Sequence, residues 1–476
     1  MAKIKTKEID FTSGNLFKKM ILYTVPLILS TLLQLFYSSA DLFTVGKFGG
    51  GESSLNAVGA NGSLINLIVA LFTGLSVGAN VYIANAKGRN DKEAATKGVG
   101  TAIILSFVVG IIVMLFGSIF AKDLLVLMNT PDDVLYKATE YLTIYFYGIP
   151  CLMIYNYGSA CLRALGDSRK PFWTLVFSGI FNIACNFLLV INFKLDVKGV
   201  AISTVISEAV SAVAVLTFLF MNKNGFAKLS FSTLKVYKLE LISILKIGVF
   251  AGLESFIFSF ANVFIQREAN TFGSIAMAGN TASNNIEGYL YNILFAFSVA
   301  VVAMVAQNYG AKKKENIKKI LIYALSTVTV LGIVMGIFTS LFSTQLLGVF
   351  IDNPESIEIG RSRLIVIAMT YFLCGTMDVL SSYLRGLEHP VTPTVITLFG
   401  ACVLRLVFIF TIFKMIPEIH TLPWLYATFP ISWALVNLIY VPFVIIISKK
   451  EFKLMDLKNG TDLGEGREVR ATETAQ

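Results

Sequence analysis

The chain has 476 residues, of which 55% are hydrophobic and only 14% are charged, and its mean hydropathy is +0.72. Soluble domains carry about 25% charged residues, so this composition excludes an ordinary soluble protein. The net charge of +9 is explained by basic loops that lie near anionic lipid. We therefore expect membrane lipid, and no nucleic acid, among the partners.

Apolar windows of about 20 residues, each long enough to cross a bilayer, recur along nearly the whole chain. They predict twelve transmembrane helices, at 17–41, 57–83, 97–121, 137–160, 171–193, 199–221, 241–266, 276–308, 320–343, 360–383, 393–415 and 424–447. The predicted fold class is therefore an all-α polytopic membrane protein.

Both ends of the chain are predicted to lie in the cytoplasm. Residues 1–20 lack the apolar core and the cleavage site of a signal peptide, so the first helix should stay in the membrane. With the N-terminus inside, most Lys and Arg residues fall in cytoplasmic loops, as the positive-inside rule requires. The opposite loops hold fewer basic residues, Arg361 and Arg363 among them.

An internal repeat divides the chain into two halves. The stretch S-V-G-A-N-V-Y-I-A-N-A-K-G at 76–88 resembles S-V-A-V-V-A-M-V-A-Q-N-Y-G at 298–310, a shift of 298 − 76 = 222 residues. The same shift relates L-R-A-L-G at 162–166 to L-R-G-L-E at 384–388. Each half holds six predicted helices, an even number. We therefore expect two pseudo-symmetric six-helix bundles in the same orientation, with a cleft between them.

The repeat and the charge pattern together give five segments. Polar, Gly-containing sequence at the C-terminal end is typical of disorder. The predicted segments are a cytoplasmic N-terminal segment (1–16), an N-terminal bundle (17–221), a cytoplasmic linker (222–240), a C-terminal bundle (241–448) and a disordered cytoplasmic tail (449–476).

The first half contains a carboxylate within an apolar helix, Asp41 in F-Y-S-S-A-D-L-F. Such a residue costs roughly 2.5–3.5 kcal/mol on insertion scales and is by default a functional candidate. Its expected partners are Asn182 and Asn186, on one face of the fifth helix, and Ser203 or Thr204 on the sixth. This set can bind a proton or, through its oxygens, Na⁺. The alternative for the asparagines is plain helix–helix hydrogen bonding, worth about 0.6 kcal/mol each.

The second half offers two further acids, Glu254 in the seventh helix and Asp378 in the tenth. Each is expected either to carry a coupling cation, Na⁺ included, or to form a structural ion pair, for which Arg405 is the candidate partner. Glu208 and Glu287 are weaker candidates, since either could face a crevice or an interface.

Four uncharged residues are expected to line the cleft. Asn262 in S-F-A-N aligns with Asp41 in S-S-A-D, and Asn156 aligns with the tenth-helix acid, so both positions stay polar in both halves. Gln34 and Tyr37 precede the first-helix acid by about two turns and one turn. Helix–helix hydrogen bonding is the alternative role for each of them.

The sequence contains no convincing catalytic motif. G-L-S-V-G at 74–78 matches a nucleophile elbow only formally, because it lies inside a membrane helix and the two histidines, His389 and His420, fall in loops. There is no phosphate-binding loop, and the five cysteines lack metal-ligand spacing. We expect no enzyme activity and no cofactor. Uphill transport would then use an ion gradient, which supplies about 2.3 kcal/mol per charge across 100 mV.

Several stretches together resemble one transporter family. They are A-D-L-F-T-V-G-K-F-G at 40–49, A-G-N-T-A-S-N-N-I-E-G-Y at 278–289 and Y-F-L-C-G-T-M-D-V-L-S-S-Y-L-R-G at 371–386. From about Asn15 to Lys449 the chain is similar to the MATE (multidrug and toxic compound extrusion) family. The resemblance implies a V-shaped fold that rocks between outward-open and inward-open states. It also implies antiport of H⁺ or Na⁺ against drug-like, often cationic compounds.

The resemblance implies two alternative coupling sites. In proton-coupled relatives a first-helix Asp works with polar residues on helices 5 and 6, and the first-half set around Asp41 matches that pattern. Asn186 departs from it, because many relatives carry an acid there. In sodium-coupled relatives acids on helices 7 and 10 hold the cation, and Glu254 and Asp378 match those positions. The coupling ion, H⁺ or Na⁺, stays open at this point.

We therefore expect a secondary active antiporter of the bacterial inner membrane that exports amphiphilic, often cationic compounds and works as a monomer. One alternative is a lipid-linked saccharide flippase of the same superfamily, which would favour an Arg-rich cavity. Another is a membrane receptor or enzyme, against which the missing catalytic motifs and the duplication both count.

Overall fold

Each predicted window is helical in the computed structural model, which describes residues 8–128, 130–222 and 225–473. Helices form here because a chain in lipid must satisfy its backbone hydrogen bonds within the segment. The helices of the first half are α1 (Leu16–Phe48), α2 (Glu52–Gly88), α3 (Lys92–Leu127), α4 (Asp132–Ala164), α5 (Arg169–Asn186), the π-helix η1 (Phe187–Asn192) and α6 (Asp196–Phe220).

The second half is more broken than the first. Its fourth span is a pair of helices, α11 and α12, bent by 44°. Its fifth span is a run of four short helical pieces. The helices are α7 (Lys238–Asn270), α8 (Ser274–Gly310), α9 (Lys314–Leu341), α10 (Ser343–Leu347), α11 (Pro354–Ala368), α12 (Tyr371–Gly386), α13 (Val391–Thr397), the π-helix η2 (Leu398–Val403), α14 (Leu404–Phe410), α15 (Ile412–Met415) and α16 (Leu422–Glu473).

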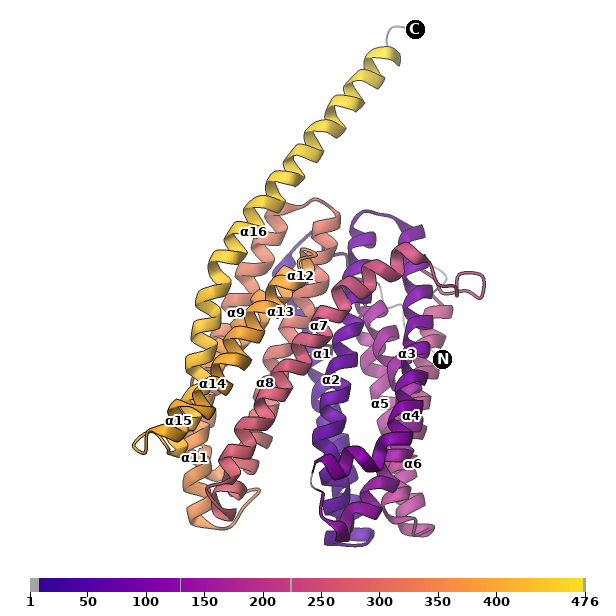
Figure 1. Ribbon diagram of the computed structural model, residues 1–476. Coiled ribbons are helices and arrows are strands. Elements are labelled where there is room, and N and C mark those ends of the chain that lie inside the picture. Colours follow the sequence, from indigo (N-terminus) through magenta and orange to yellow (C-terminus); the bar gives the residue numbers. More distant parts are fainter. Residues whose placement is uncertain (1–7, 129, 223–224, 474–476) are drawn as a thin grey trace.

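The helix ends confirm the internal repeat. Both α1 and α7 have 33 residues, and they begin 238 − 16 = 222 residues apart. Both α2 and α8 have 37 residues, and they begin 274 − 52 = 222 residues apart. Figure 1 shows the two resulting groups of helices, which we call the N lobe (α1–α6) and the C lobe (α7–α16). They approach each other at one end of the molecule and diverge toward the other.

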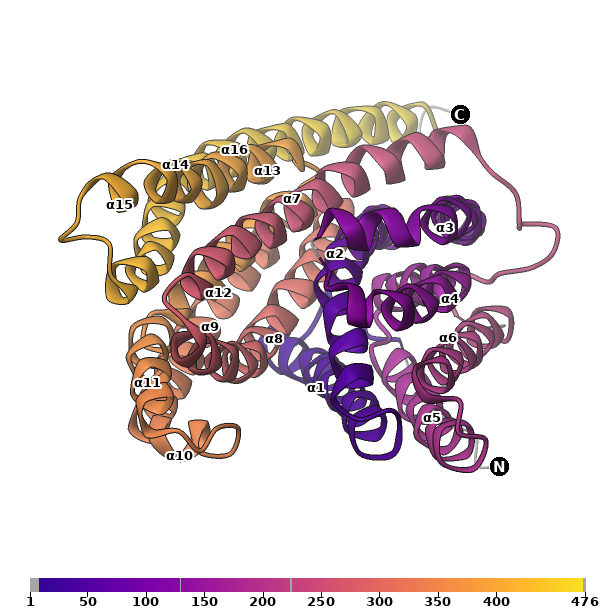
Figure 2. The same ribbon diagram turned by 60° about the horizontal axis from the view of Figure 1, so that its bottom comes forward.

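The lobes meet through backbone rather than through large side chains. Figure 2 shows α2 beside α7 and α8. A Cβ on Gly74 of α2 would overlap Gly252 of α7, and a Cβ on Gly78 would overlap the carbonyl oxygen of Ile244. Small residues let two helices pack this closely in a membrane. The glycines at 74 and 78, which formally match a nucleophile motif, therefore act in helix packing.

The outer surface is apolar, as a protein surrounded by lipid requires. Ten helices of the described chain are long and apolar enough to span a membrane, and the bent α11–α12 pair makes an eleventh. α4, with 33 residues, fills the remaining predicted window. On α3 the side chains of Ile112, Phe116 and Ile119 are 60%, 62% and 70% exposed. An apolar stripe of this kind is suited to lipid contact rather than to water. The protein is a multi-pass membrane protein.

Residues 8–13, which we call the N-terminal strap, join the two lobes at the end where α2 and α8 finish. On the N lobe, the backbone N–H of Ile9 donates to the carbonyl of Gly166 at 3.1 Å, and Glu8 pairs with Lys87 at 3.3 Å. On the C lobe, the N–H of Phe11 donates to Oε1 of Gln307 at 2.9 Å. The strap therefore fastens the lobes where they approach each other.

Two segment boundaries differ from those expected. α7 begins at Lys238, inside the predicted linker of 222–240. α16 continues through the predicted disordered tail to Glu473 and projects from the molecule in Figure 1. A helix that is already packed against the C lobe needs no new nucleation to continue, and elongation costs much less than initiation.

Candidate functional site

Asp41 lies on α1 within hydrogen-bond distance of two other helices. Nδ2 of Asn186, the last residue of α5, donates to Oδ1 of Asp41 at 2.5 Å. Oγ1 of Thr204 on α6 lies 3.3 Å from Oδ2. Asn182, one turn before Asn186, accepts from Asn186 Nδ2 at 3.3 Å. Both Thr204 and Ser203 donate to carbonyls of their own helix, but of the two only Thr204 also lies within reach of Asp41. The structure thus brings together Asp41, Asn182, Asn186 and Thr204.

The carboxylate of Asp41 is surrounded by donors and lacks a cationic partner. Among the described residues, no Lys or Arg forms an ion pair or a hydrogen bond with it. Amide N–H and hydroxyl donors stabilise a charged carboxylate, whereas Na⁺ requires several oxygen ligands. Asn186 presents an N–H to Asp41, and Thr204 presents a hydroxyl that also donates to the carbonyl of Val200. This chemistry suits a carboxylate that gains and loses a proton.

The end of α5 and its close contact with α1 position Asn182 and Asn186 beside Asp41. The π-helix η1 begins at Phe187, directly after Asn186, and π-helical turns inside α-helices are frequent at functional sites. Tyr37, one turn before Asp41 on α1, lies against Gly179 of α5, where a Cβ would overlap its ring. α1 can therefore approach α5 closely. Gln34 is exposed on α1.

In the C lobe, Glu254 is bound by an arginine on a neighbouring helix. Nη2 of Arg385 on α12 lies 2.8 Å from Oε1 of Glu254. The hydroxyl of Ser381 donates to the same oxygen at 2.8 Å, and that of Thr397 does so at 3.3 Å. Glu254 is only 7% exposed. It is therefore a buried acid with a cation already in place.

Asp378 lies near this ion pair without joining it. It is on α12, seven residues before Arg385, and the charges of both Glu254 and Arg385 act on it. Its Oδ2 is buried and has no hydrogen-bond partner among the described residues. The two acids predicted as a second site are thus near each other, but a guanidinium, rather than a vacant cation position, accompanies them.

The MatE family profile matches residues 26–188 and 251–411, which together make up more than half of the chain. The chain belongs to the MATE family. The "Probable multidrug resistance protein YoeA" of Bacillus subtilis strain 168 is 29% identical to it over 392 residues, 81% of this chain and 84% of the relative. The "Probable multidrug resistance protein NorM" of Thermotoga maritima is 24% identical over 412 residues, 83% of this chain and 86% of that one.

Solved structures confirm the MATE fold. The structure described as "Crystal structure of MATE in complex with MaL6" matches with a TM-score of 0.87 at 21% identity, over 94% of this chain and 100% of that chain. The prediction of two pseudo-symmetric six-helix bundles with this fold is therefore confirmed.

Arg405, predicted as the partner of a C-lobe acid, has another environment in this MATE protein. Its Nε donates to Ser432 at 2.7 Å, its Nη1 donates to Asn262 at 3.3 Å, and its guanidinium lies 4.7 Å from the ring centroid of Phe429. It forms no ion pair with an acid among the described residues. The prediction of an acid paired with Arg405 is wrong, because α14 turns this side chain toward α16 and its aromatic residues.

Two buried glutamates of the C lobe pair with arginines that were not predicted as partners from the sequence. Arg385 pairs with Glu254, and Arg363, predicted in a loop, lies buried in α11 with its Nε 2.8 Å from Glu287. Arg385 is seven residues after Asp378 and thus on the same helical face, a spacing that relates it to Asp378 but not to its actual partner, Glu254. Arg363 follows a polar stretch and is predicted in a loop, although it also falls within the predicted window 360–383, and the structure places it in the helix.

Two predicted cleft residues are only partly buried within their lobes. Asn156 on α4 is partly buried, and its Nδ2 has no hydrogen-bond partner among the described residues. Asn262 binds Arg405. At the 222-residue shift Asp41 corresponds to Val263, so Asn262 is one residue from strict equivalence. It nevertheless connects α7 to the fifth span of its lobe, as Asp41 connects α1 to α5.

Proposed function

We propose that this protein is a secondary active efflux antiporter that exports amphiphilic, often cationic compounds in exchange for H⁺, with Asp41 as the proton-binding residue. The observation that carries the proposal is the Asp41 carboxylate, which lies in a membrane helix among donors and has no basic partner among the described residues. Such a carboxylate is neutralised by a proton or by a cationic substrate. Binding of either then disfavours binding of the other, which is the coupling that antiport requires.

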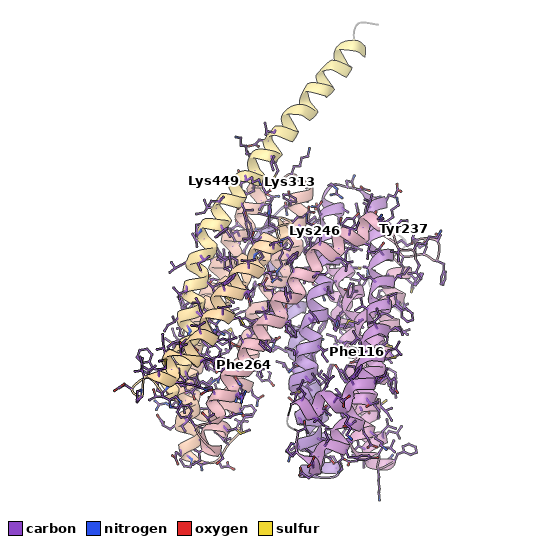
Figure 3. All side chains as sticks on the ribbon, in the orientation of Figure 1. Phe116, Tyr237, Lys246, Phe264, Lys313 and Lys449 are labelled. Atoms are coloured by element: carbon purple, nitrogen blue, oxygen red, sulfur yellow. The ribbon has the colours of Figure 1, made fainter. Side chains whose placement is uncertain are left out.

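The substrate class is supported by the relatives. The YoeA and NorM proteins are named as multidrug resistance proteins. We infer that this chain also exports drug-like molecules, as a monomer, from the bacterial cytoplasm across the inner membrane. Figure 3 shows Lys246, Lys313 and Lys449 toward one end of the molecule. The positive-inside rule supports assigning that end, with the N-terminal strap and the C-terminal part of α16, to the cytoplasm.

Proton coupling in the N lobe is favoured over sodium coupling in the C lobe. A sodium ion at Glu254 would have to displace the guanidinium of Arg385, which already lies 2.8 Å from the carboxylate. Removing one partner from a buried ion pair typically costs about 3–5 kcal/mol. Asp41 imposes no such cost, since it has no guanidinium to displace.

The flippase alternative is less well supported, because it calls for arginines that line a cavity. Arg363 and Arg385 are engaged by glutamates. Arg405 is 1% exposed and lies against aromatic rings. These three side chains are therefore enclosed in the C lobe and are unsuited to holding a polyphosphate.

The test uses everted membrane vesicles that contain the protein and a fluorescent cationic dye. A vesicle lumen made acidic should drive dye into the lumen, and a sodium gradient of the same size should not. The Asp41→Asn variant should lose the response, while Glu140→Gln, a change in an acid paired with Lys198 on the N lobe, should keep it. Dye uptake driven by sodium, lost in Glu254→Gln and kept in Asp41→Asn, would overturn the proposal.

A further inference from the structure

Glu208 is a second isolated acid of the N lobe. It lies on α6 four residues after Thr204, so both side chains project from the same face of the helix. It is 8% exposed. No described residue donates a hydrogen bond to its carboxylate, and its buried Oε2 has no partner among the described residues.

α4 encloses this carboxylate on the opposite side. A Cβ on Gly148 would overlap Oε2 of Glu208, so the α4 backbone lies directly against the acid. The titratable groups that act on it are Tyr141, Tyr145 and Cys151 of α4 and Asp41 of α1. None of these groups carries a positive charge. Within the described chain, Glu208 therefore lacks both a cation and a donor.

The two acids of the N lobe have different environments. Asp41 accepts hydrogen bonds from Asn186 and Thr204, which favour its charged form. Glu208 has no such compensation, and an ionised carboxylate buried without a partner is strongly disfavoured relative to the neutral acid. Asp41 thus has the donors that a charged carboxylate needs, and Glu208 lacks them within the described chain.

We propose that Glu208 is a second proton-carrying residue of the transport cycle, and this inference rests on the proposed function. When the lobes change conformation and α6 shifts against α4, water reaches the acid, its O–H bond breaks and the proton passes to water on the cytoplasmic side. The carboxylate is reprotonated from the other side before the site closes. The chain would then exchange two protons per substrate, one at Asp41 and one at Glu208, although Asn186 cannot titrate.

The experiment counts protons in proteoliposomes of purified protein by finding the substrate gradient that balances a fixed pH gradient. With membrane potential clamped at zero, each coupled proton supports a tenfold substrate ratio per pH unit, since each pH unit is about 1.4 kcal/mol per proton. Wild-type protein should balance near a hundredfold ratio at one pH unit. Glu208→Gln, which is nearly isosteric and resembles the protonated acid, should balance near tenfold. Glu140→Gln, the matched control on α4, should match wild type.

An unchanged hundredfold ratio in Glu208→Gln would overturn the inference while leaving proton coupling at Asp41 intact. Absence of any proton-driven transport by wild-type protein would instead overturn the proposed function. Infrared difference spectra between acid and alkaline pH provide a readout independent of transport. The protonated-carboxyl band of wild-type protein in lipid should lose one component in Glu208→Gln, and an unaltered band would contradict the assignment.

Discussion

The first two helices of the two lobes match in length, but the lobes balance the charges of their acids differently. In the C lobe, Glu254 and Glu287 each have an arginine nitrogen at 2.8 Å, and Asp378 lies beside the Glu254–Arg385 pair, whose charges act on it, without an ion pair of its own among the described residues. In the N lobe, Asp41 and Glu208 have no basic partner among the described residues. A guanidinium therefore lies among the acids of the C lobe, whereas none accompanies Asp41 or Glu208 among the described residues. The two lobes therefore share a fold but differ in how their acids are paired. We propose that the N lobe, whose acids lack arginine partners, couples transport.

The largest effect on transport is expected at Asp41, whose near counterpart in the C lobe is the uncharged Asn262. Asp41→Asn should abolish transport driven by a pH gradient, since an amide can neither exchange a proton nor bind the cationic substrate in place of one, and a proton carried by Glu208 would then have nothing to drive. Asn262→Asp, which adds an acid beside Arg405 in the C lobe, should leave the coupling ion and its stoichiometry unchanged. Dye uptake by vesicles checks both. Rescue of Asp41→Asn by Asn262→Asp would show that the lobes are interchangeable and would break the comparison.

The second prediction concerns stability rather than transport. Arg385→Gln should lower the free energy of unfolding by about 3–5 kcal/mol, because it leaves Glu254 as an uncompensated buried charge. The double change Glu254→Gln with Arg385→Gln should recover much of that loss, since neither charge is then left alone. Asp41→Asn should cost far less than Arg385→Gln.

Chemical denaturation in detergent would measure these differences between the lobes. Equal losses for Arg385→Gln and Asp41→Asn would mean that the charge of Asp41 has an unrecognised fixed partner.

The close approach between the lobes should be sensitive to single methyl groups. Gly78→Ala would overlap the carbonyl of Ile244, and overpacking of this kind costs about 1–3 kcal/mol. We expect the lobes to separate at the strap end. Asn85 of α2 is 3% exposed and donates to Glu388 of the C lobe at 2.7 Å, so the thiol of an added Asn85→Cys change should become more reactive. Gly59→Ala is the matched control on α2, because open space surrounds that position. The interface assignment would fail if both changes had the same effect on labelling.

The smallest expected effect is at the strap. Gln307→Leu removes the acceptor of the Phe11 N–H and should loosen the closed end by about 1 kcal/mol. Cysteine labelling at position 85 measures this change as well, and labelling as slow as in wild type would contradict it.

The strap should also be insensitive to pH in the range of a transport assay. Partial burial acts to raise the pKa of Asp10, but hydrogen bonds from Thr12 and Ser13 and the charge of Lys19 outweigh it, so that the pKa is lowered overall. A lowered pKa means that stability is present above the unfolded value of 3.8 and is lost only as the pH falls through the folded pKa. Asp10 should therefore contribute nothing to any pH dependence near neutrality.

The sequence by itself determined the helices, the repeat and the Asp41 set. Apolar windows give spans because a membrane helix satisfies its own backbone, which is a local property. The repeat and the two asparagines four residues apart are likewise visible in the linear chain. Thr204 required the structure, since only contact with α1 separates it from Ser203.

Ion pairing was decided by tertiary structure alone. The sequence suggested Arg405 as a partner for an acid, yet Arg385 binds Glu254, and Arg363 binds Glu287. Glu208 has the same apolar neighbours in sequence as many packing residues, and its isolation depends on α4 covering it. Which charge meets which is set by the faces that distant helices present to one another. A charge pair of this kind therefore becomes visible only when the helices are packed.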